Sequence, residues 1–334
     1  MDEVKRTRAE YGGFLPLELN SRKEYFDTYE NNLSRFNSVK AAFAYIIENL
    51  SCKKIYIPYY YCPSTTQAIK TMDLDVVFYH IGGNLMPDNI IDEESSIVLL
   101  VDYFGVCSDE ITYLSKSFTK AQVIIDRAHA FFAEPVMISN IHNVYSAKKF
   151  FGIPDGSYLI SQSIVKEIET PIDSNEYAGY LLKTYEVGTN VSYADKKAAD
   201  DIIASNYSSM SKLAIGLLRN VDYDNVKEIR RENFEFLRQT FDEVNELKLP
   251  HNVSSYQFPL LLSSKGKMIK QQLVAEKIFV STLWKGEDLL NSGNEFELNM
   301  SENAVFLTMD QRYGIDDMKY IANETLKFIN SIGH

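Results

Sequence analysis

The sequence predicts an α/β protein, with a mostly parallel central sheet, helices on both faces of that sheet, and a smaller C-terminal α+β domain. Three observations support this prediction. Short apolar segments of strand length alternate with helical segments of about ten to fifteen residues, a pattern typical of βαβ units. The run at residues 97–101 is entirely apolar, as expected for a strand buried on both faces. A long amphipathic helix from Asp224 precedes a region in which short strands and helices are mixed.

Composition limits the possible functions. The chain has 334 residues, enough for about two domains, and 45% of them are hydrophobic, so that a large core can form. The formal net charge of -12 argues against nucleic acid or an anionic membrane as a partner, because both need a basic surface. The amino terminus is charged and the longest apolar run is far shorter than a membrane span, so we expect neither a signal peptide nor a membrane anchor.

Cysteines and glycine-rich loops give two further limits. Cys52, Cys62 and Cys107 show no metal-ligand or disulfide spacing, which is typical of reduced thiols. We therefore expect a cytoplasmic protein with no metal site. No Gly-x-Gly-x-x-Gly fingerprint and no Walker-type Gly-Lys-Ser/Thr occurs, so the two commonest nucleotide-binding loops of such sheets are missing.

The first elements supply a helix start and a group of tyrosines. Asn37 or Ser38 caps a helix that begins near Val39, and the free N–H groups of a helix start can bind phosphate, although a cap without a ligand fits as well. A strand at residues 54–58 ends at a proline and leads into three successive tyrosines at 59–61. These tyrosines indicate either a ligand-facing surface or an aromatic core cluster.

Two later strands end in the residues that carry the functional prediction. The apolar run at 123–125 is followed by Asp126 and His129, as expected for a buried parallel strand whose C-terminal end reaches a binding crevice. The next strand runs into Lys148 and Lys149, so a carboxylate and an amine meet at one edge of the sheet. This pair suits pyridoxal phosphate, whose aldehyde forms a Schiff base with a lysine while an aspartate keeps its pyridine nitrogen protonated. Taken singly, each residue also fits a plain strand end.

The same residues carry a family resemblance. The segment 126–129, Asp-Arg-Ala-His, and Lys149 followed six and seven residues later by Asp155-Gly156 resemble the motifs of the DegT-type sugar aminotransferases, pyridoxal-phosphate enzymes of fold type I. The resemblance implies that Lys149 is the catalytic lysine, that Asp126 contacts the pyridine nitrogen, and that His129 contacts the ring hydroxyl or the ring face. Lys148 is the alternative lysine, and the spacing to Asp155-Gly156 favours Lys149.

Further positions match cofactor contacts of that family. They are Ser38, Val39 and Ser146 near the phosphate, Tyr61 or Cys62 on the pyridine ring, and Asn190, which would reach the phosphate of a second subunit. The family usually has Gly or Thr where Val39 stands and a second Gly at Ser157. The Arg that normally follows the Gly-x-Asn loop is missing.

The C-terminal region completes the expected architecture. We expect residues 1–235 to form the large cofactor-binding domain with an N-terminal arm, and residues 236–334 to form the small domain. Within the small domain, strands are expected near residues 256–262, 278–280 and 304–307.

Three residues are candidate substrate contacts. Trp284 follows an expected strand near the substrate entrance, and Tyr60 lies in the tyrosine segment. Arg312 can bind a carboxylate or phosphate as a bidentate fork, or equally hold the domain by a structural salt bridge.

The function implied by the resemblance is transfer of an amino group from an amino acid, such as glutamate, to a keto sugar, expected to be nucleotide-linked, in surface-polysaccharide or amino-sugar biosynthesis. The family also implies a homodimer with active sites at its interface. Two alternatives remain open. One is elimination or dehydration at a sugar, although the related dehydratase has histidine in place of the lysine present here as Lys149. The other is a catalytically idle binding domain.

Overall fold

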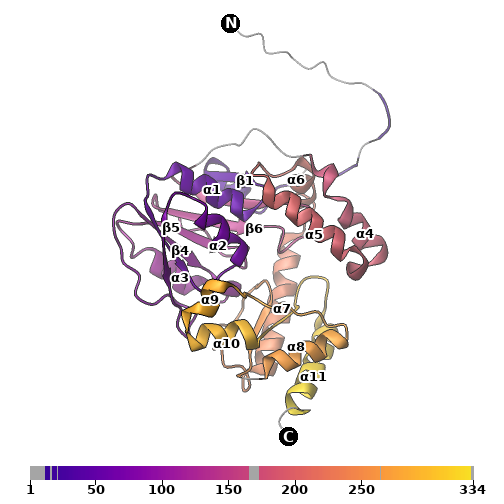
Figure 1. The fold of residues 1–334 in the computed structure, drawn as a ribbon. Helices are drawn as coiled ribbons and strands as arrows, with labels where there is room; N and C mark the ends of the chain where they lie inside the picture. Colours follow the sequence, from indigo (N-terminus) through magenta and orange to yellow (C-terminus); the bar gives the residue numbers. More distant parts are fainter. Residues whose placement is uncertain (1–11, 16, 21, 165–172, 264, 332–334) are drawn as a thin grey trace.

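The computed structural model describes residues 12–15, 17–20, 22–164, 173–263 and 265–331, and a seven-stranded sheet lies at its centre (Figure 1). The strand order is β1-β7-β6-β5-β4-β2-β3. The strands are β1 (Leu33–Phe36), β2 (Lys54–Pro58), β3 (Asp75–Tyr79), β4 (Ser96–Val101), β5 (Gln122–Arg127), β6 (Ile141–Ser146) and β7 (Ser157–Ser161). Strands β3, β2, β4, β5 and β6 pair in parallel, whereas β7 is antiparallel to both β6 and β1. The predicted, mostly parallel α/β sheet is therefore confirmed.

Helices surround this sheet, and a second, two-stranded sheet lies in the C-terminal part (Figure 1). The second sheet pairs β8 (Phe258–Leu261) with β9 (Ala304–Leu307) in an antiparallel manner. The helices are α1 (Val39–Asn49), α2 (Pro63–Lys70), α3 (Ser108–Ser115), α4 (Gly179–Val187), α5 (Thr189–Ser205), α6 (Lys212–Leu218), α7 (Tyr223–Phe241), α8 (Gly266–Ala275), α9 (Glu287–Ser292), α10 (Glu295–Asn303) and α11 (Ile315–Ser331). None of the described helices is long and apolar enough to cross a membrane.

Local sequence explains where the elements that build the site begin. Strand β4 is buried along its whole length, in line with its apolar sequence. Helix α1 begins after Ser38, whose side chain accepts a hydrogen bond from the N–H of Ala41 at 3.2 Å, so Ser38 and not Asn37 is the cap. Helix α7 is capped in the same way by Asp222, which accepts from the N–H of Asn225.

One predicted strand is wrong. Residues 278–280 form no strand, and the neighbouring Ser281 makes only an isolated bridge to Phe306. The reason is local: the N–H of Ile278 donates to the carbonyl of Leu273 at 2.8 Å, which closes the end of α8 and removes that donor from sheet pairing.

The core continues from the central sheet into the small sheet. One buried apolar cluster includes residues of β4 and β5 together with residues of β8 and β9. Phe104, next to β4, packs against Phe306 of β9 with ring centroids 4.8 Å apart. The proposed domain division between residues 235 and 236 falls inside α7 and stays a prediction. The shared core holds the small sheet firmly beside the strand ends.

Candidate active site

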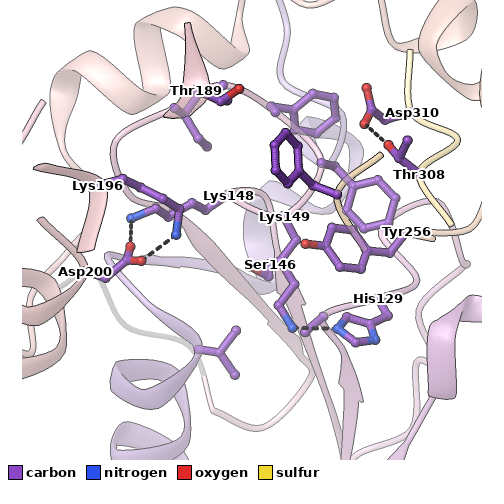
Figure 2. A pocket seen from close by; sticks show the side chains of 18 of the residues that line it. His129, Ser146, Lys148, Lys149, Thr189, Lys196, Asp200, Tyr256, Thr308 and Asp310 are labelled. Atoms are coloured by element: carbon purple, nitrogen blue, oxygen red, sulfur yellow. Dashed lines mark hydrogen bonds and ion pairs between the residues drawn. The ribbon is translucent and has the colours of Figure 1, made fainter. Parts of the chain in front are cut away.

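A single large cavity, of about 1330 Å³, lies at the C-terminal ends of β4, β5 and β6 in the described part of the chain. Its walls include Val101, Asp126 and Ser146 from these strands and Ser38 from the start of α1. Helices α4 and α5 form one side, and residues after β9 form the opposite side. Figure 2 shows this arrangement, with Asp200 on the α5 side and Tyr256 and Asp310 across from it. Crevices at such strand ends are the usual ligand sites of open α/β sheets.

Asp126 is a buried carboxylate at the end of β5. It is 5% exposed, and its oxygens accept hydrogen bonds from the Tyr61 hydroxyl at 2.5 Å and from the N–H of Ala128 at 2.8 Å. Burial raises the pKa of Asp126, while Lys149, Tyr61 and the Ala128 N–H act in the opposite direction. The carboxylate therefore has a positive neighbour and two donors that favour its ionised form.

Lys149 lies three residues beyond the end of β6, and its amine points into the cavity. The Nζ atom is 2.7 Å from Nε2 of His129 and 5.8 Å from the ring centroid of Tyr256 (Figure 2). Burial lowers the pKa of Lys149, whereas the charges of Asp126 and Cys62 raise it. A lysine with a lowered pKa has a larger neutral fraction, which is the form that attacks carbonyl groups.

Lys148 turns to a different wall of the same cavity. Its Nζ pairs with Asp200 Oδ1 at 2.6 Å, and Asp200 Oδ2 also receives Lys196 Nζ at 2.5 Å (Figure 2). Lys149, by contrast, has no carboxylate partner of this kind among the described residues, and its electrostatic neighbour is Asp126. The two adjacent lysines therefore have separate surroundings.

His129 is buried and held between flat rings. Its imidazole stacks on Tyr256 with centroids 4.8 Å apart and on Trp284 with centroids 5.4 Å apart. Burial, with a contribution from Lys149, lowers its pKa well below the usual value, so the ring is neutral. While Nε2 faces Lys149, the buried Nδ1 has no hydrogen-bond partner in the described residues. An unpaired buried ring nitrogen suggests that the site is completed by a ligand.

The other predicted cofactor contacts border this cavity. They are Ser38, Val39, Tyr61, Cys62, Ser146 and Asn190. Asn190 lies in the first turn of α5 and borders the cavity of its own chain, and its reach to the phosphate of a second subunit stays a prediction. Asp155, by contrast, has a structural surrounding, since its carboxylate accepts from the Ser211 N–H and the Tyr177 hydroxyl, both at 2.9 Å.

The three predicted substrate contacts lie in different places. Trp284 borders the cavity, and so does Arg312, whose guanidinium forms a two-point ion pair with Asp310 at 2.7 and 2.8 Å. Tyr60 is fully buried behind Trp284, and its hydroxyl donates to the carbonyl of Leu283 at 2.6 Å. Tyr60 is not among the described residues that border the cavity.

Sequence reasoning missed several residues of the walls. Arg230 of α7 and Tyr256, which precedes β8, both border the cavity, as do Lys196 and Asp200 of α5. No local pattern distinguishes them, because each comes from a segment remote from residues 126–149 in the chain. The described residues contain no group of three or more His, Cys, Asp or Glu side chains that could hold a metal ion.

Comparison with known proteins shows which solved structures have a similar fold. No protein-family model and no curated protein matches the sequence. A protein described as a sugar aminotransferase from Streptococcus pneumoniae superimposes with a TM-score of 0.61 at 14% identity, over 92% of this chain and 90% of that one. A DegT/DnrJ/EryC1/StrS aminotransferase from Brucella abortus does so at 0.61 and 13%, over 89% and 85%. The chain has the fold of the DegT-type sugar aminotransferases.

Enzymes with other chemistry share the DegT-type fold. The GDP-4-keto-6-deoxy-D-mannose-3-dehydratase of E. coli, solved with bound hydrated PLP, matches with a TM-score of 0.62 at 15% identity, over 90% of this chain and 89% of that one. The fold predicted from the sequence is thus confirmed, while a common fold supports more than one reaction.

Proposed function

We propose that the protein is a pyridoxal-phosphate-dependent aminotransferase that passes an amino group from an amino acid, such as glutamate, to a keto sugar, one that carries a nucleotide. The observation that carries this proposal is the pairing of Asp126 with Lys149. Asp126 is buried and Lys149 is half-buried, both line one cavity at adjoining strand ends, and each shifts the pKa of the other. Structures with this fold include forms solved with pyridoxal or pyridoxamine phosphate.

The residues of the cavity fit this cofactor at three points. The start of α1 offers the Ser38 hydroxyl and free backbone N–H groups to a phosphate. The buried carboxylate of Asp126 suits a protonated pyridine nitrogen. The unpaired Nδ1 of His129 is a polar group that a ring substituent would satisfy after a turn of the imidazole. Ser146, Val39 and Tyr61 border the space between these points.

When bound, the cofactor supplies an aldehyde that takes up amino groups and a cationic ring that withdraws electrons from the donor's α-carbon. The protein's own groups do the rest. Lys149 would hold the cofactor through Nζ, and the same Nζ, as a neutral amine, would take up and release the proton that the reaction moves. Burial lowers the pKa of Lys149, which keeps a neutral amine available for that task. Asp126 would hold a proton on the ring nitrogen, and the Tyr61 hydroxyl donates to this carboxylate and fixes its position.

The presence of Lys149 favours transfer over elimination. Sugar dehydratases have this fold too, and they are the second candidate function. Amino transfer needs a base that takes up a proton and gives it back, and the Lys149 amine would supply that base at Nζ, so we rank transfer first. The idle-domain alternative predicts a protein that takes up no cofactor.

Exposed apolar side chains support the proposal of a homodimer. On α4 and α5 they include Leu182, Tyr185 and Tyr193, which are 74%, 88% and 67% exposed. Tyr193 also borders the cavity. A soluble monomer seldom exposes such a group, and a second subunit on this surface would close the cavity from outside. Sedimentation of the wild type and of Tyr185→Asp tests this: a wild-type monomer would contradict it.

Borohydride reduction followed by peptide mapping tests the cofactor and the lysine together. With added pyridoxal phosphate, we expect a pyridoxyl label on Lys149 in the wild type, no label in Lys149→Ala, and an unchanged label in the control Lys148→Ala. A label on Lys148 would overturn the assignment of the lysine. A colourless wild type without any label would remove the enzyme proposal. Amino transfer itself is tested by loss of the aldehyde absorbance on addition of L-glutamate.

A further inference from the structure

Arg127 is a buried cation in the middle of the segment that supplies the site. It is the last residue of β5, it lies between Asp126 and His129 in the chain, and it is 1% exposed. Asp126 and His129 border the cavity, whereas Arg127 is not among the described residues that do so. Successive side chains of a strand point to opposite faces, so Arg127 points away from the face on which Asp126 lies. An influence of Arg127 on the site therefore has to pass through its neighbours.

The partners of Arg127 come from the segment that follows β4. Nη1 lies 3.8 Å from Oδ2 of the buried Asp102, and Nη2 donates to Oγ1 of Thr112 in α3 at 2.8 Å. Asp102 borders the cavity, but its Oδ2 also accepts a hydrogen bond from the Ser108 hydroxyl at 2.7 Å. Burial raises the pKa of Asp102, and the charge of Arg127 opposes this rise. The carboxylate and the guanidinium therefore depend on each other for their charged forms.

Stability alone is a weak reason for this ion pair. Two buried charges lose their hydration, so such a pair adds little to the free energy of unfolding, and well-packed neutral side chains often serve as well. The Nε atom of Arg127 is also buried without a hydrogen-bond partner among the described residues, which adds a further cost. What the ion pair does provide is a fixed separation between the ends of β4 and β5.

The backbone joins the same two strand ends. The N–H of Asp102 donates to the carbonyl of Asp126 at 2.9 Å, and a backbone hydrogen bond of 3.0 Å closes the turn at residues 127–130. Gly105 lies so close to this turn that a Cβ atom there would be 2.8 Å from the carbonyl oxygen of His129. A shift of the segment after β4 would therefore displace the turn, and with it both Asp126 and His129.

We propose that Asp102 and Arg127 are positioning residues whose ion pair holds the turn at residues 127–130, so that Asp126 and His129 face the same bound cofactor, a role that rests on the proposed function. The two cavity residues have no direct bond to each other that could fix their separation within the described part of the chain. Asp126 accepts from Tyr61 and His129 contacts Lys149. The common support lies behind them, in the guanidinium that sits between them in the chain.

The only tryptophan of the chain lies against this turn and can report on it. Trp284 stacks on His129 with ring centroids 5.4 Å apart, and Tyr256 also stacks on this imidazole. A protonated imidazole quenches indole fluorescence more strongly than a neutral one. Burial lowers the pKa of His129 well below its usual value, and the charge of Lys149 acts in the same direction. The wild-type emission should therefore stay constant between about pH 8 and about pH 5.5.

A pH titration of Trp284 fluorescence in the cofactor-free protein tests the role of the ion pair. The deciding variant is Asp102→Asn/Arg127→Met, because it removes both charges together and leaves no buried ion without a partner. If the turn loosens, water reaches His129, its pKa rises toward about 6.5, and the emission falls as the pH is lowered. Adding His129→Gln should abolish this response. The control Glu235→Gln/Arg238→Met, which neutralises an ion pair within α7, should behave as the wild type does.

Two further measurements complete the test. Thr112→Val keeps both charges and removes only the acceptor of Nη2, so it should give a smaller response in the same direction, and it decides the question if the double variant does not fold. In an absorbance titration, the double variant should bind pyridoxal phosphate about tenfold more weakly than the wild type.

A constant emission in the variants would overturn the positioning role, and so would a response that survives His129→Gln or an unchanged cofactor affinity. Failure of the proposed function has a different sign, because a wild type without a borohydride label would still give the fluorescence result.

Discussion

The hydrogen bond from Tyr61 to Asp126 gives a sharp test of the electrostatics of the site. Tyr61→Phe removes only the hydroxyl that donates to Asp126 Oδ2 at 2.5 Å and leaves the N–H of Ala128 as the remaining donor. Burial already raises the pKa of Asp126, and the lost donor was one of the groups that opposed this rise. We therefore expect a further rise in the pKa of Asp126 and a less stable protein at neutral pH.

The size of the effect follows from the charge of the acceptor. A hydrogen bond to a charged group contributes about 1.5–3 kcal/mol, and one to a neutral acceptor about 1 kcal/mol. When the pKa of a carboxyl group is higher in the folded protein than in the unfolded one, ionisation of that group destabilises the folded state. The loss of folding free energy therefore appears as pH rises through the folded pKa. The difference between variant and wild type should therefore grow from about 1 kcal/mol at low pH to about 1.5–3 kcal/mol at neutral pH.

Urea unfolding of the cofactor-free protein, measured between about pH 5 and pH 8, reads out this difference. The matched control is Tyr60→Phe, because Tyr60 is the adjacent buried tyrosine and donates to the neutral carbonyl of Leu283. Its loss should be about 1 kcal/mol at every pH. If Tyr61→Phe behaves in the same pH-independent way as Tyr60→Phe, Asp126 is not an ionised carboxylate held by Tyr61, and the reasoning is refuted.

Three other variants test separate parts of the structure. His142 is buried, and burial lowers its pKa to about 4. Because the unfolded chain then binds a proton that the folded protein does not, the free energy of unfolding of the wild type should fall by about 2 kcal/mol between about pH 6.5 and pH 5. Urea unfolding should show a smaller fall in His142→Gln. Ser38→Ala removes the cap of α1 and should lower the free energy of unfolding by about 1 kcal/mol, measured by thermal unfolding. It should also weaken pyridoxal-phosphate binding in an absorbance titration. Equal cofactor affinity in the variant and the wild type would show that Ser38 does not bind the phosphate. Gly266→Ala would place a methyl carbon 1.7 Å from the Asn303 carbonyl oxygen and should cost about 3 kcal/mol, whereas Gly179→Ala, with nothing within 4 Å, should be neutral.

The sequence was most informative where a function depends on the end of a strand. Asp126 follows an apolar run and Lys149 follows the next strand along the chain, and in a parallel sheet such ends gather at one edge, so we could expect from the sequence that the two residues lie near each other. The spacing to Asp155-Gly156 favoured Lys149 over Lys148 in the sequence, and the structure gives the two amines different partners, His129 for Lys149 and Asp200 for Lys148. The strand expected at 278–280 failed because a hydrogen bond to the end of α8 was not visible in the pattern.

By itself, the sequence determined the α/β class, the strand ends near Asp126 and Lys149, and a helix start at Asn37 or Ser38, because these depend on short-range patterns of polarity and capping. Only the tertiary structure decided that Arg230 and Tyr256 reach the same cavity, since it is the packing of the C-terminal region on the strand ends that brings them there. The tertiary structure also set the different surroundings of Tyr60 and Tyr61. The two adjacent tyrosines differ in their hydrogen-bond partners, which lie far away in the chain. Tyr60 donates to the carbonyl of Leu283, and Tyr61 donates to the carboxylate of Asp126.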